Sequence, residues 1–244
     1  MTAADGAKSP LPWPIKAILF DKGSRRGSRP RGRLADELLR RLGYDPARDE
    51  FAADSPLLWA TNSEIAACWS EVPELEGIID IRERVERQFA NQDAFPPVAV
   101  TDLAALFDRL CARGLALGVA TMDSTAAVEA TLARFAVRDR VRFVAGADSG
   151  FELKPGAGMV LGFCAALGVA PAEVAVVGDN LADLAMARAA GAGLAVAVLT
   201  GGCPAAALQA RADLVLASIA QLEAALDGWS GRTPGRQSLA ADRS

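Results

Sequence analysis

The sequence predicts an α/β fold in which a parallel β-sheet lies between two layers of helices. Short apolar runs rich in Val, Leu and Ala alternate with segments of helical length, as right-handed βαβ crossovers require. The clearest pair is Ala175–Gly178, which is apolar like a strand buried on both faces, and the Ala-rich segment Leu181–Ala190. Gly191 is placed to end that helix. A mainly helical insert is expected to interrupt the alternation after the first strand.

The composition is that of a folded globular protein. Its 244 residues suffice for one large domain or for a core with a smaller insert, and 51% of them are hydrophobic. A net charge of −4 gives no overall attraction to nucleic acid or to anionic membranes. Residues 1–14 carry no apolar signal segment, the apolar runs are too short to span a bilayer, and the four cysteines are widely spaced. We therefore expect a soluble, cytoplasmic protein whose cysteines are reduced and buried.

The sequence contains no histidine. This excludes Ser-His-Asp and Cys-His catalysis, and it excludes every zinc site that uses a histidine ligand. Any chemistry must therefore rely on carboxylates, lysine, hydroxyl groups and backbone dipoles.

The first strand is expected at Ile15–Phe20 and ends at Asp21. A carboxylate in this place is a candidate nucleophile, although Asp also commonly opens turns. The following segment, Lys22–Arg33, carries six basic residues and no acidic one, with Gly, Ser and Pro between them. It could form a phosphate or nucleic-acid patch, but it lacks aromatic residues for base stacking. We interpret it as a mobile, solvated loop.

The stretch Leu34–Ala90 is predicted to be mainly helical, and residues 34–95 are predicted to form a small cap domain between two parts of the core. The expected helices are Leu34–Leu42, ended by Gly43, a second from Ser63 through Trp69, and the amphipathic Ile78–Phe89. The sequence Phe95-Pro96-Pro97 follows as a hinge.

Helices and strands alternate again in residues 98–227, which together with residues 14–21 are predicted to form the α/β core. The expected helices are Asp102–Arg113, one that Asp123 or Ser124 caps and that runs through Phe135, Met159–Leu167, Leu181–Ala190 and Ser218–Leu226. The expected strands are Leu115–Ala120, Arg142–Ala145, Ala175–Gly178, Ala195–Leu199 and Asp213–Leu216. Residues 228–244 are polar and aperiodic, and we expect a disordered tail.

Polar residues follow several of these strands, and α/β sheets bind their ligands at this edge. Asp179 and Asp183 are four residues apart. Two carboxylates in one cleft suit a hard cation such as Mg²⁺, but the alternative is that they only cap the helix and favour its N-terminus. Together with Asp21, Thr121 and Lys154, which also follow strands or lie in the loops after them, these carboxylates suit a reaction in which Asp21 attacks a phosphoryl group. A metal and Lys154 would neutralise charge, and the Thr121 hydroxyl with adjacent backbone N–H groups would hold phosphate oxygens.

These motifs, in this order, resemble those of the haloacid dehalogenase-like hydrolase superfamily. They are Leu19-Phe20-Asp21-Lys22-Gly23-Ser24, Val119-Ala120-Thr121, Lys154-Pro155 and Val177-Gly178-Asp179-Asn180-Leu181-Ala182-Asp183. The segments Gly146–Phe151 and Gly178–Gly191 are most similar to the phosphoglycolate phosphatase-like members. The resemblance spans roughly Ile15 to Leu226. It implies a Rossmann-like three-layer core, with a helical cap inserted between the first and second motifs.

The resemblance also implies a role for each residue of the site. Asp21 would be the nucleophile and a metal ligand, Asp179 would bind Mg²⁺, and Asp183 would support the metal or its waters. Three further residues would bind the phosphate, the last of them also pairing with the nucleophile: Thr121, Met122 and Lys154.

The first motif departs from the family pattern Asp-x-Asp-Gly-Thr, in which the second Asp is the general acid/base. Here Gly23 follows Lys22 directly, so either Gly23 replaces this Asp, or the Asp is deleted and Gly23-Ser24 stand for Gly-Thr. Both alignments leave no acid/base carboxylate. The backbone carbonyl of Gly23 could still bind the metal, as that position does in the family. The sequence therefore predicts impaired turnover at a preserved metal site.

We therefore expect a Mg²⁺-dependent phosphomonoester hydrolase with weak activity, which acts on a small phosphorylated metabolite through an aspartyl-phosphate intermediate. A dehalogenase-type hydrolase also uses an Asp nucleophile, but it needs no metal, so the pair Asp179 and Asp183 disfavours it. A catalytically inactive phosphate-binding or interaction module stays open, and measured turnover distinguishes it. A nucleic-acid module based on Lys22–Arg33 is least favoured, and a steep salt dependence of binding would mark it. No nucleic-acid or membrane partner is expected.

Overall fold

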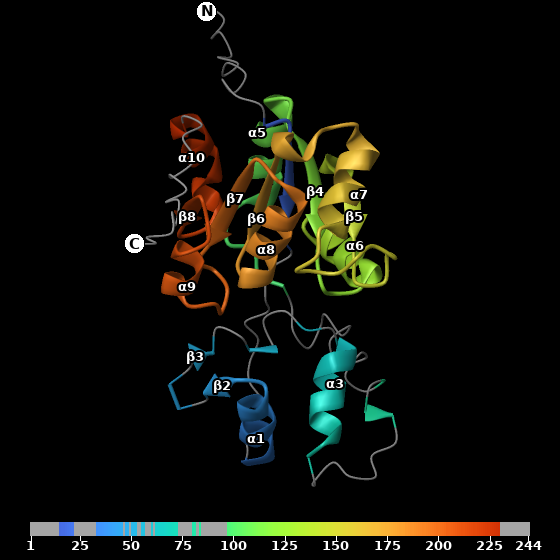
Figure 1. Cartoon of the computed structure of the whole chain (residues 1–244). Coiled ribbons are helices and arrows are strands. Elements are labelled where there is room, and N and C mark those ends of the chain that lie inside the picture. The colour runs from blue at the N-terminus through green and yellow to red at the C-terminus, as the bar shows by residue number, and fades with distance from the viewer. Residues whose placement is uncertain are drawn as a thin grey trace, which may run out of the picture.

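The computed structural model describes residues 15–21, 33–45, 47–48, 50–52, 55–56, 60, 62–72, 80–81, 83 and 97–229, and the statements below concern these residues. Their main feature is a six-stranded parallel sheet with the strand order β5-β4-β1-β6-β7-β8 (Figure 1). The strands are β1 Ala17–Phe20, β4 Ala116–Ala120, β5 Val141–Ala145, β6 Val174–Gly178, β7 Leu194–Val198 and β8 Leu214–Leu216. The predicted α/β fold is confirmed.

Two helical layers cover the sheet because successive side chains of each strand point to opposite faces. In β1, Ile18 and Phe20 belong to one buried apolar cluster, and Ala17 and Leu19 belong to the other. The first layer consists of α5 Leu103–Ala112, α6 Thr125–Arg134 and α10 Leu222–Gly228. The second consists of α7 Gly158–Leu167, α8 Leu181–Ala190 and α9 Ala205–Gln209. The three-layer arrangement thus follows from the alternation within the strands.

Local capping signals set the ends of the helices. α8 occupies Leu181–Ala190 as predicted, and Gly191 ends it in the left-handed conformation with a φ of 73°. Its N-cap is Asn180, whose side chain accepts two backbone hydrogen bonds from the first turn. The alternative that Asp179 caps this helix is therefore wrong. Of the two candidate caps for α6, Ser124 is the one whose side chain accepts a backbone hydrogen bond.

The insert contains a β-hairpin besides its helices. α1 Arg33–Arg41 and α3 Asn62–Ser70 match two of the expected helices, and between them β2 Tyr44–Asp45 pairs antiparallel with β3 Glu50–Phe51. This hairpin was not predicted from the sequence, because strands of two residues are too short to show an alternating pattern. The rings of Tyr44 and Phe51, 4.8 Å apart, pack across the hairpin. Figure 1 shows these elements grouped on the side of the sheet where β1 ends.

Part of the predicted organisation lies outside the described residues. This part comprises residues 22–32 of the basic segment, most of the expected helix at residues 78–89, residues 95–96 of the hinge, and residues 230–244. Arg33 is described, and it is the first residue of α1 rather than the end of a loop. Trp229 packs against the core after α10, so any tail begins later than residue 228. The division into core, cap and tail therefore stays a prediction.

The remaining differences are local. A 3₁₀ turn, η4 Ile219–Gln221, precedes α10 where one continuous helix was expected, and the five-residue α9 is too short for a periodic pattern. Two further 3₁₀ turns are η2 Arg138–Arg140 and η3 Pro171–Glu173. All four cysteines are free, but only Cys164 and Cys203 are buried, while Cys68 and Cys111 are partly exposed. Within the described part of the chain, none of the helices has the length and hydropathy that a membrane crossing needs.

Candidate active site

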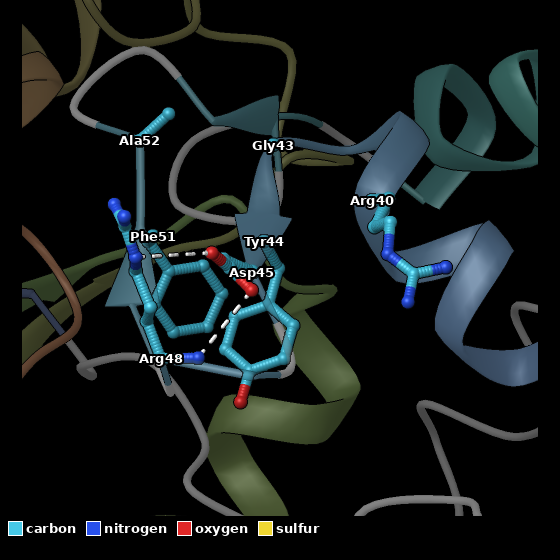
Figure 2. A pocket seen from close by; sticks show the side chains of 7 residues that line it. All are labelled: Arg40, Gly43, Tyr44, Asp45, Arg48, Phe51 and Ala52. Atoms are coloured by element: carbon cyan, nitrogen blue, oxygen red, sulfur yellow. Dashed lines mark hydrogen bonds and ion pairs between the residues drawn. The ribbon is translucent and has the colours of Figure 1, made fainter.

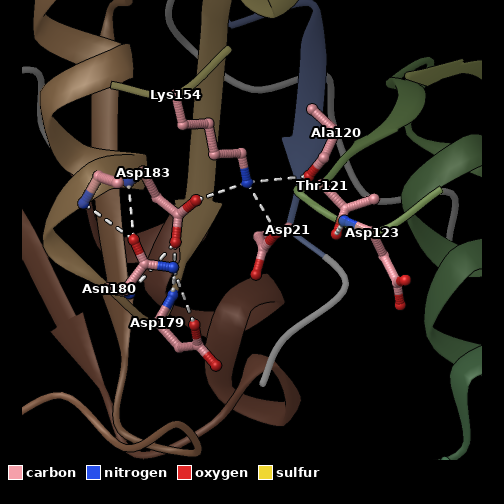
Figure 3. A network of polar contacts seen from close by, with 9 residues as sticks. Asp21, Ala120, Thr121, Asp123, Lys154, Asp179, Asn180 and Asp183 are labelled. Atoms are coloured by element: carbon pink, nitrogen blue, oxygen red, sulfur yellow. Dashed lines mark hydrogen bonds and ion pairs between the residues drawn. The ribbon is translucent and has the colours of Figure 1, made fainter. Parts of the chain in front are cut away.

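The predicted site residues lie where neighbouring strands of the sheet end. β1 pairs with β4 on one side and with β6 on the other, and the strand order runs outward from β1 in both directions. Such a switch point opens a crevice at the carboxyl ends of the strands, where α/β sheets bind ligands. Asp21 is fixed there because its backbone N–H donates to the carbonyl oxygen of Val177 at 2.8 Å. Figure 3 shows the predicted residues gathered around this point: Asp21, Thr121, Lys154, Asp179 and Asp183.

Lys154 is the centre of this network (Figure 3). Its Nζ donates to Asp21 Oδ1 at 2.7 Å, to Asp183 Oδ1 at 2.6 Å and to the carbonyl oxygen of Ala120 at 3.0 Å. These three acceptors match the three protons of an ammonium group, and the side chain is only 1% exposed. Burial alone would lower the pKa of Lys154, but the carboxylates of Asp183 and Asp21 raise it above its ordinary value. Lys154 therefore stays a cation beside the predicted nucleophile.

Further hydrogen bonds hold the loop that carries Lys154. The backbone N–H and the hydroxyl of Thr125, at the start of α6, both donate to Asp148 Oδ1, at 2.8 and 2.6 Å. The hydrogen bond from the Thr125 hydroxyl is the main cause that lowers the pKa of the Asp148 carboxyl. The backbone N–H of Ala147 donates to the carbonyl oxygen of Asp123 at 2.8 Å. The loop after β5 is thereby tied to the loop after β4, and this fixes Lys154 relative to the end of β4.

Asp183 is fully buried, and both of its carboxylate oxygens are engaged. Oδ1 accepts from Lys154, and Oδ2 accepts from the backbone N–H groups of Asp179 and Asn180, both at 3.1 Å. A Cβ at position 178 would lie 2.3 Å from this Oδ2, so the close approach requires Gly178. Burial raises the pKa of Asp183 to about 7; Lys154 opposes the shift, and the neighbouring carboxylates add to it. Asp183 therefore supports the start of α8, as the capping interpretation expects, and also belongs to the site.

Three carboxylates meet at this point. Asp21, Asp179 and Asp183 each offer an oxygen, and these oxygens all lie within 4.8 Å of one another. Lys154 compensates only one of the three negative charges, so a divalent cation would neutralise the excess. Carboxylate oxygens are the ligands that Mg²⁺ and similar hard cations prefer. Because both oxygens of Asp183 are hydrogen-bonded, Asp21 and Asp179 are the residues suited to direct contact with a cation.

Thr121 follows β4 beside this network. It is 5% exposed, its backbone N–H donates to the carbonyl oxygen of Ala145 at 2.9 Å, and its Oγ1 accepts from the backbone N–H of Asp123 at 3.2 Å. A hydroxyl that accepts one hydrogen bond can still donate its proton to a phosphate oxygen. Met122 follows in the turn before α6 and is partly buried. Gly23, the predicted backbone ligand of the metal, lies outside the described residues.

The insert contains a separate hollow of about 470 Å³ (Figure 2). Its lining consists of Arg40, Gly43, Tyr44, Asp45, Arg48, Phe51 and Ala52. The two arginines are exposed, and Arg48 Nε lies 3.7 Å from Asp45 Oδ2. The hollow shares no residue with the three carboxylates, so we do not regard it as the reaction centre.

Several residues that shape the site received no role from the sequence. Asn180 shows the ordinary N-cap signal, an Asn before an Ala-rich segment, and could have been found. Gly178 is part of the fourth motif, but the sequence does not reveal its contact with a carboxylate. A Cβ on Gly201, in the loop after β7, would lie 2.4 Å from Asp179 Oδ2, and no local signal in the sequence points to this.

A family model described as haloacid dehalogenase-like hydrolase matches residues 47–191, which is more than half of the chain. The matched range begins after Asp21 and Gly23 and includes the other predicted site residues: Thr121, Met122, Lys154, Asp179 and Asp183. Among curated proteins, the phosphoglycolate phosphatase of Chromobacterium violaceum is 44% identical over 86 residues. These residues are 35% of this chain and 37% of that protein, so the match spans little more than a third of the relative's length.

Solved structures show the same fold. A predicted phosphoglycolate phosphatase from Haemophilus somnus superposes with a TM-score of 0.66 at 18% identity, covering 87% of this chain and 98% of that one. A hydrolase from Pseudomonas syringae gives a TM-score of 0.62 at 19% identity, covering 87% and 98%. At these identities the likeness concerns the fold alone. With the family model, it confirms the resemblance that the motifs indicate: the chain belongs to the haloacid dehalogenase-like hydrolase family.

Proposed function

We propose that this chain is a Mg²⁺-dependent phosphomonoester hydrolase that acts on a small phosphorylated metabolite. The observation that carries the proposal is the position of Lys154, whose buried ammonium group bridges Asp21 and Asp183 at 2.7 and 2.6 Å. The third carboxylate, Asp179, lies in the same cluster. The proposed nucleophile, a buried ammonium group and oxygens suited to a metal thus lie within one cluster. The name of the Chromobacterium violaceum relative makes phosphoglycolate the first substrate to test.

In the proposed reaction, a carboxylate oxygen of Asp21 attacks the phosphorus of the bound ester. The new bond joins that oxygen to phosphorus while the bond from phosphorus to the leaving oxygen breaks, so that Asp21 carries the phosphoryl group and the leaving alkoxide takes up a proton. Water then hydrolyses this acyl phosphate and releases inorganic phosphate. Because the ammonium group of Lys154 touches Asp21, it is placed to offset the negative charge of the phosphoryl oxygens in the transition state.

The loop between β4 and α6 would hold the phosphate oxygens. The Thr121 hydroxyl is a donor at the end of β4, and the backbone N–H of Met122 follows it. The loop leads into the N-terminus of α6, where the helix dipole favours an anion. In our proposal, this loop positions the ester with its phosphorus facing Asp21.

The acidic residues would hold the metal. Asp21 and Asp179 would bind Mg²⁺ directly together with the backbone carbonyl of Gly23, and Asp183 would support them. The bound cation supplies charge neutralisation at the phosphate oxygens. Mg²⁺ should raise the thermal stability of the protein, by about 2.7 kcal/mol at a hundred-fold excess over its Kd, and Asp179→Ala should remove this gain. A melting temperature that does not change at millimolar Mg²⁺ in either protein would contradict the metal assignment.

The first motif favours slow turnover, and it keeps a second function open. Neither Gly23 nor the residues beside it provide an acid/base carboxylate. The leaving group therefore lacks a placed proton donor, and the hydrolytic water lacks a placed proton acceptor. The same departure favours a phosphate-binding or interaction module that has lost catalysis on an otherwise preserved site. Nitrophenyl phosphates, whose leaving group needs no proton, should therefore be cleaved better than alkyl phosphates.

A phosphatase screen of the purified protein tests the proposal. We expect phosphate release from nitrophenyl phosphate, and more slowly from phosphoglycolate and other small phosphomonoesters, in Mg²⁺ and not in EDTA. Binding of these compounds without any release would favour the non-catalytic module. Equal rates in Mg²⁺ and in EDTA would contradict the metal-dependent mechanism.

We also infer that the protein works in a reducing compartment such as the cytoplasm. All four of its cysteines are free, although two of them are partly exposed. Fractionation of cells that express the full chain tests this inference, and recovery in a secreted fraction would contradict it.

A further inference from the structure

The Asp179 carboxylate lies against the backbone of a loop that the sequence motifs do not include. This loop, residues 199–204, joins β7 to α9. Asp179 is 3% exposed, and its Oδ1 lies 3.4 Å from the side-chain amide nitrogen of Asn180. On its other side is Gly201, which is buried. The carboxylate of Asp179 therefore lies between Asn180, the next residue in the chain, and Gly201, which belongs to the loop after β7.

Gly201 is needed there for space and not for backbone conformation. Its φ does not lie in the left-handed region, which holds other glycines of the chain such as Gly191. A Cβ at position 201 would lie 2.4 Å from Asp179 Oδ2, 2.5 Å from its Cγ and 2.6 Å from its Cβ. These three atoms are the nearest ones to such a Cβ, and all belong to the Asp179 side chain. A methyl group at position 201 would therefore displace the carboxylate of Asp179.

We propose that Gly201 is a positioning residue that sets where the Asp179 carboxylate points and thereby sets the affinity of the acidic cluster for a divalent cation. This inference rests on the proposed metal-dependent function. Asp183 has a similar environment, because its Oδ2 packs against Gly178. The carboxylates of Asp179 and Asp183 thus each pack against a glycine that leaves space for them. Gly178, however, belongs to the same turn as both carboxylates, whereas Gly201 comes from another part of the chain and can be changed separately.

The first test measures Mg²⁺ binding by calorimetry to the full chain and to Gly201→Ala. We expect Kd to rise about 10- to 100-fold, as is typical when a residue that orients a metal ligand is changed. Gly193→Ala is the matched control, because its Cβ would lie 2.0 Å from the carbonyl oxygen of Ala172, where it precedes β7 at the opposite edge of the sheet. This control should lower the melting temperature and leave Kd unchanged. An unchanged Kd in Gly201→Ala would overturn the proposal.

The second test needs no metal and separates this inference from the proposed function. In EDTA, the loss of melting temperature caused by Gly201→Ala is compared between the full chain and an Asp179→Gly background, which lacks all three displaced atoms. The loss should be small or absent in that background, and a Gly201→Ala protein that fails to fold should be rescued by it. An equal loss in both backgrounds would overturn the contact. Absence of Mg²⁺ binding to the unaltered chain, with the rescue intact, would instead refute the metal site that the proposed function requires and the role of Gly201 in cation affinity.

Discussion

Replacement of Lys154 by methionine should destabilise the protein more than any change to an exposed charge. Methionine keeps an unbranched apolar side chain and removes the ammonium group. The side chain of Lys154 is 1% exposed, and those of its partners Asp21 and Asp183 are 10% and 0% exposed. Removal of one partner leaves buried carboxylates without compensation, a change that costs about 3–5 kcal/mol in comparable sites. The pKa of Lys154 is raised on folding, so the stability that comes from protonation of this amine is present below about pH 10 and is lost as the pH rises through the folded value.

Urea unfolding in EDTA measures this loss. We expect Lys154→Met to lower the free energy of unfolding by about 3–5 kcal/mol at pH 8. The matched control is Lys16→Met, because Lys16 pairs with Glu173 while its side chain is 63% exposed. An exposed pair of this kind contributes only about 0–1 kcal/mol.

The loss should also depend on pH. The pKa of Asp183 is raised, so at pH 5 this carboxyl is largely protonated and the missing ammonium group matters less. We therefore expect a smaller loss at pH 5 than at pH 8. If Lys154→Met unfolds like the unaltered protein at pH 8, Lys154 does not compensate the buried carboxylates, and the electrostatic account of the site is wrong.

Three further predictions concern neighbouring residues. The raised pKa of Asp183 means that this carboxyl binds more protons in the metal-free folded protein than in the unfolded chain between about pH 4 and 7, so its contribution to stability in urea should fall as the pH rises through this range, and Asp183→Asn should remove this contribution. Asn180→Ala removes the side chain that accepts from the backbone N–H groups of Ala182 and Asp183, and it should lower the free energy of unfolding by about 0.5–2 kcal/mol. Gly23→Asp, or insertion of Asp before Gly23, supplies an acid/base and should raise the turnover of alkyl phosphates by up to about 10²–10⁴-fold in a steady-state assay.

The sequence predicted the core because its signals are local. Leu181–Ala190 is Ala-rich and is followed by a glycine, and these two features predict α8. The strands consist of short runs of apolar residues, and this composition predicts that they are buried in a sheet. The edge of the sheet where Asp21 and Lys154 meet follows from the parallel arrangement of the strands. Lys154 is distant from Asp21 in sequence, and only the shared edge brings them together.

Other parts of the structure depend on contacts that no short segment contains. The hairpin formed by β2 and β3 is held by Tyr44 against Phe51, and its strands are too short for a periodic signal. Gly201 is one of many glycines, and only the folded chain places it against Asp179. The choice of Asn180 over Asp179 as the cap depends on where the helix begins, because α8 starts at Leu181 and Asn180 directly precedes it. Their capping preferences are similar and do not settle it.

The measurement that tests the central claim most directly is rapid-mixing kinetics of nitrophenyl phosphate cleavage in Mg²⁺. A protein that forms an acyl phosphate on Asp21 but lacks a base to hydrolyse it should release a burst of nitrophenolate, followed by slow turnover. Asp21→Asn should abolish both phases, whereas Asp108→Asn, which alters an exposed carboxylate on α5, should keep both. If Asp21→Asn retains the burst and the rate of the unaltered protein, Asp21 is not the nucleophile and the proposed mechanism is refuted.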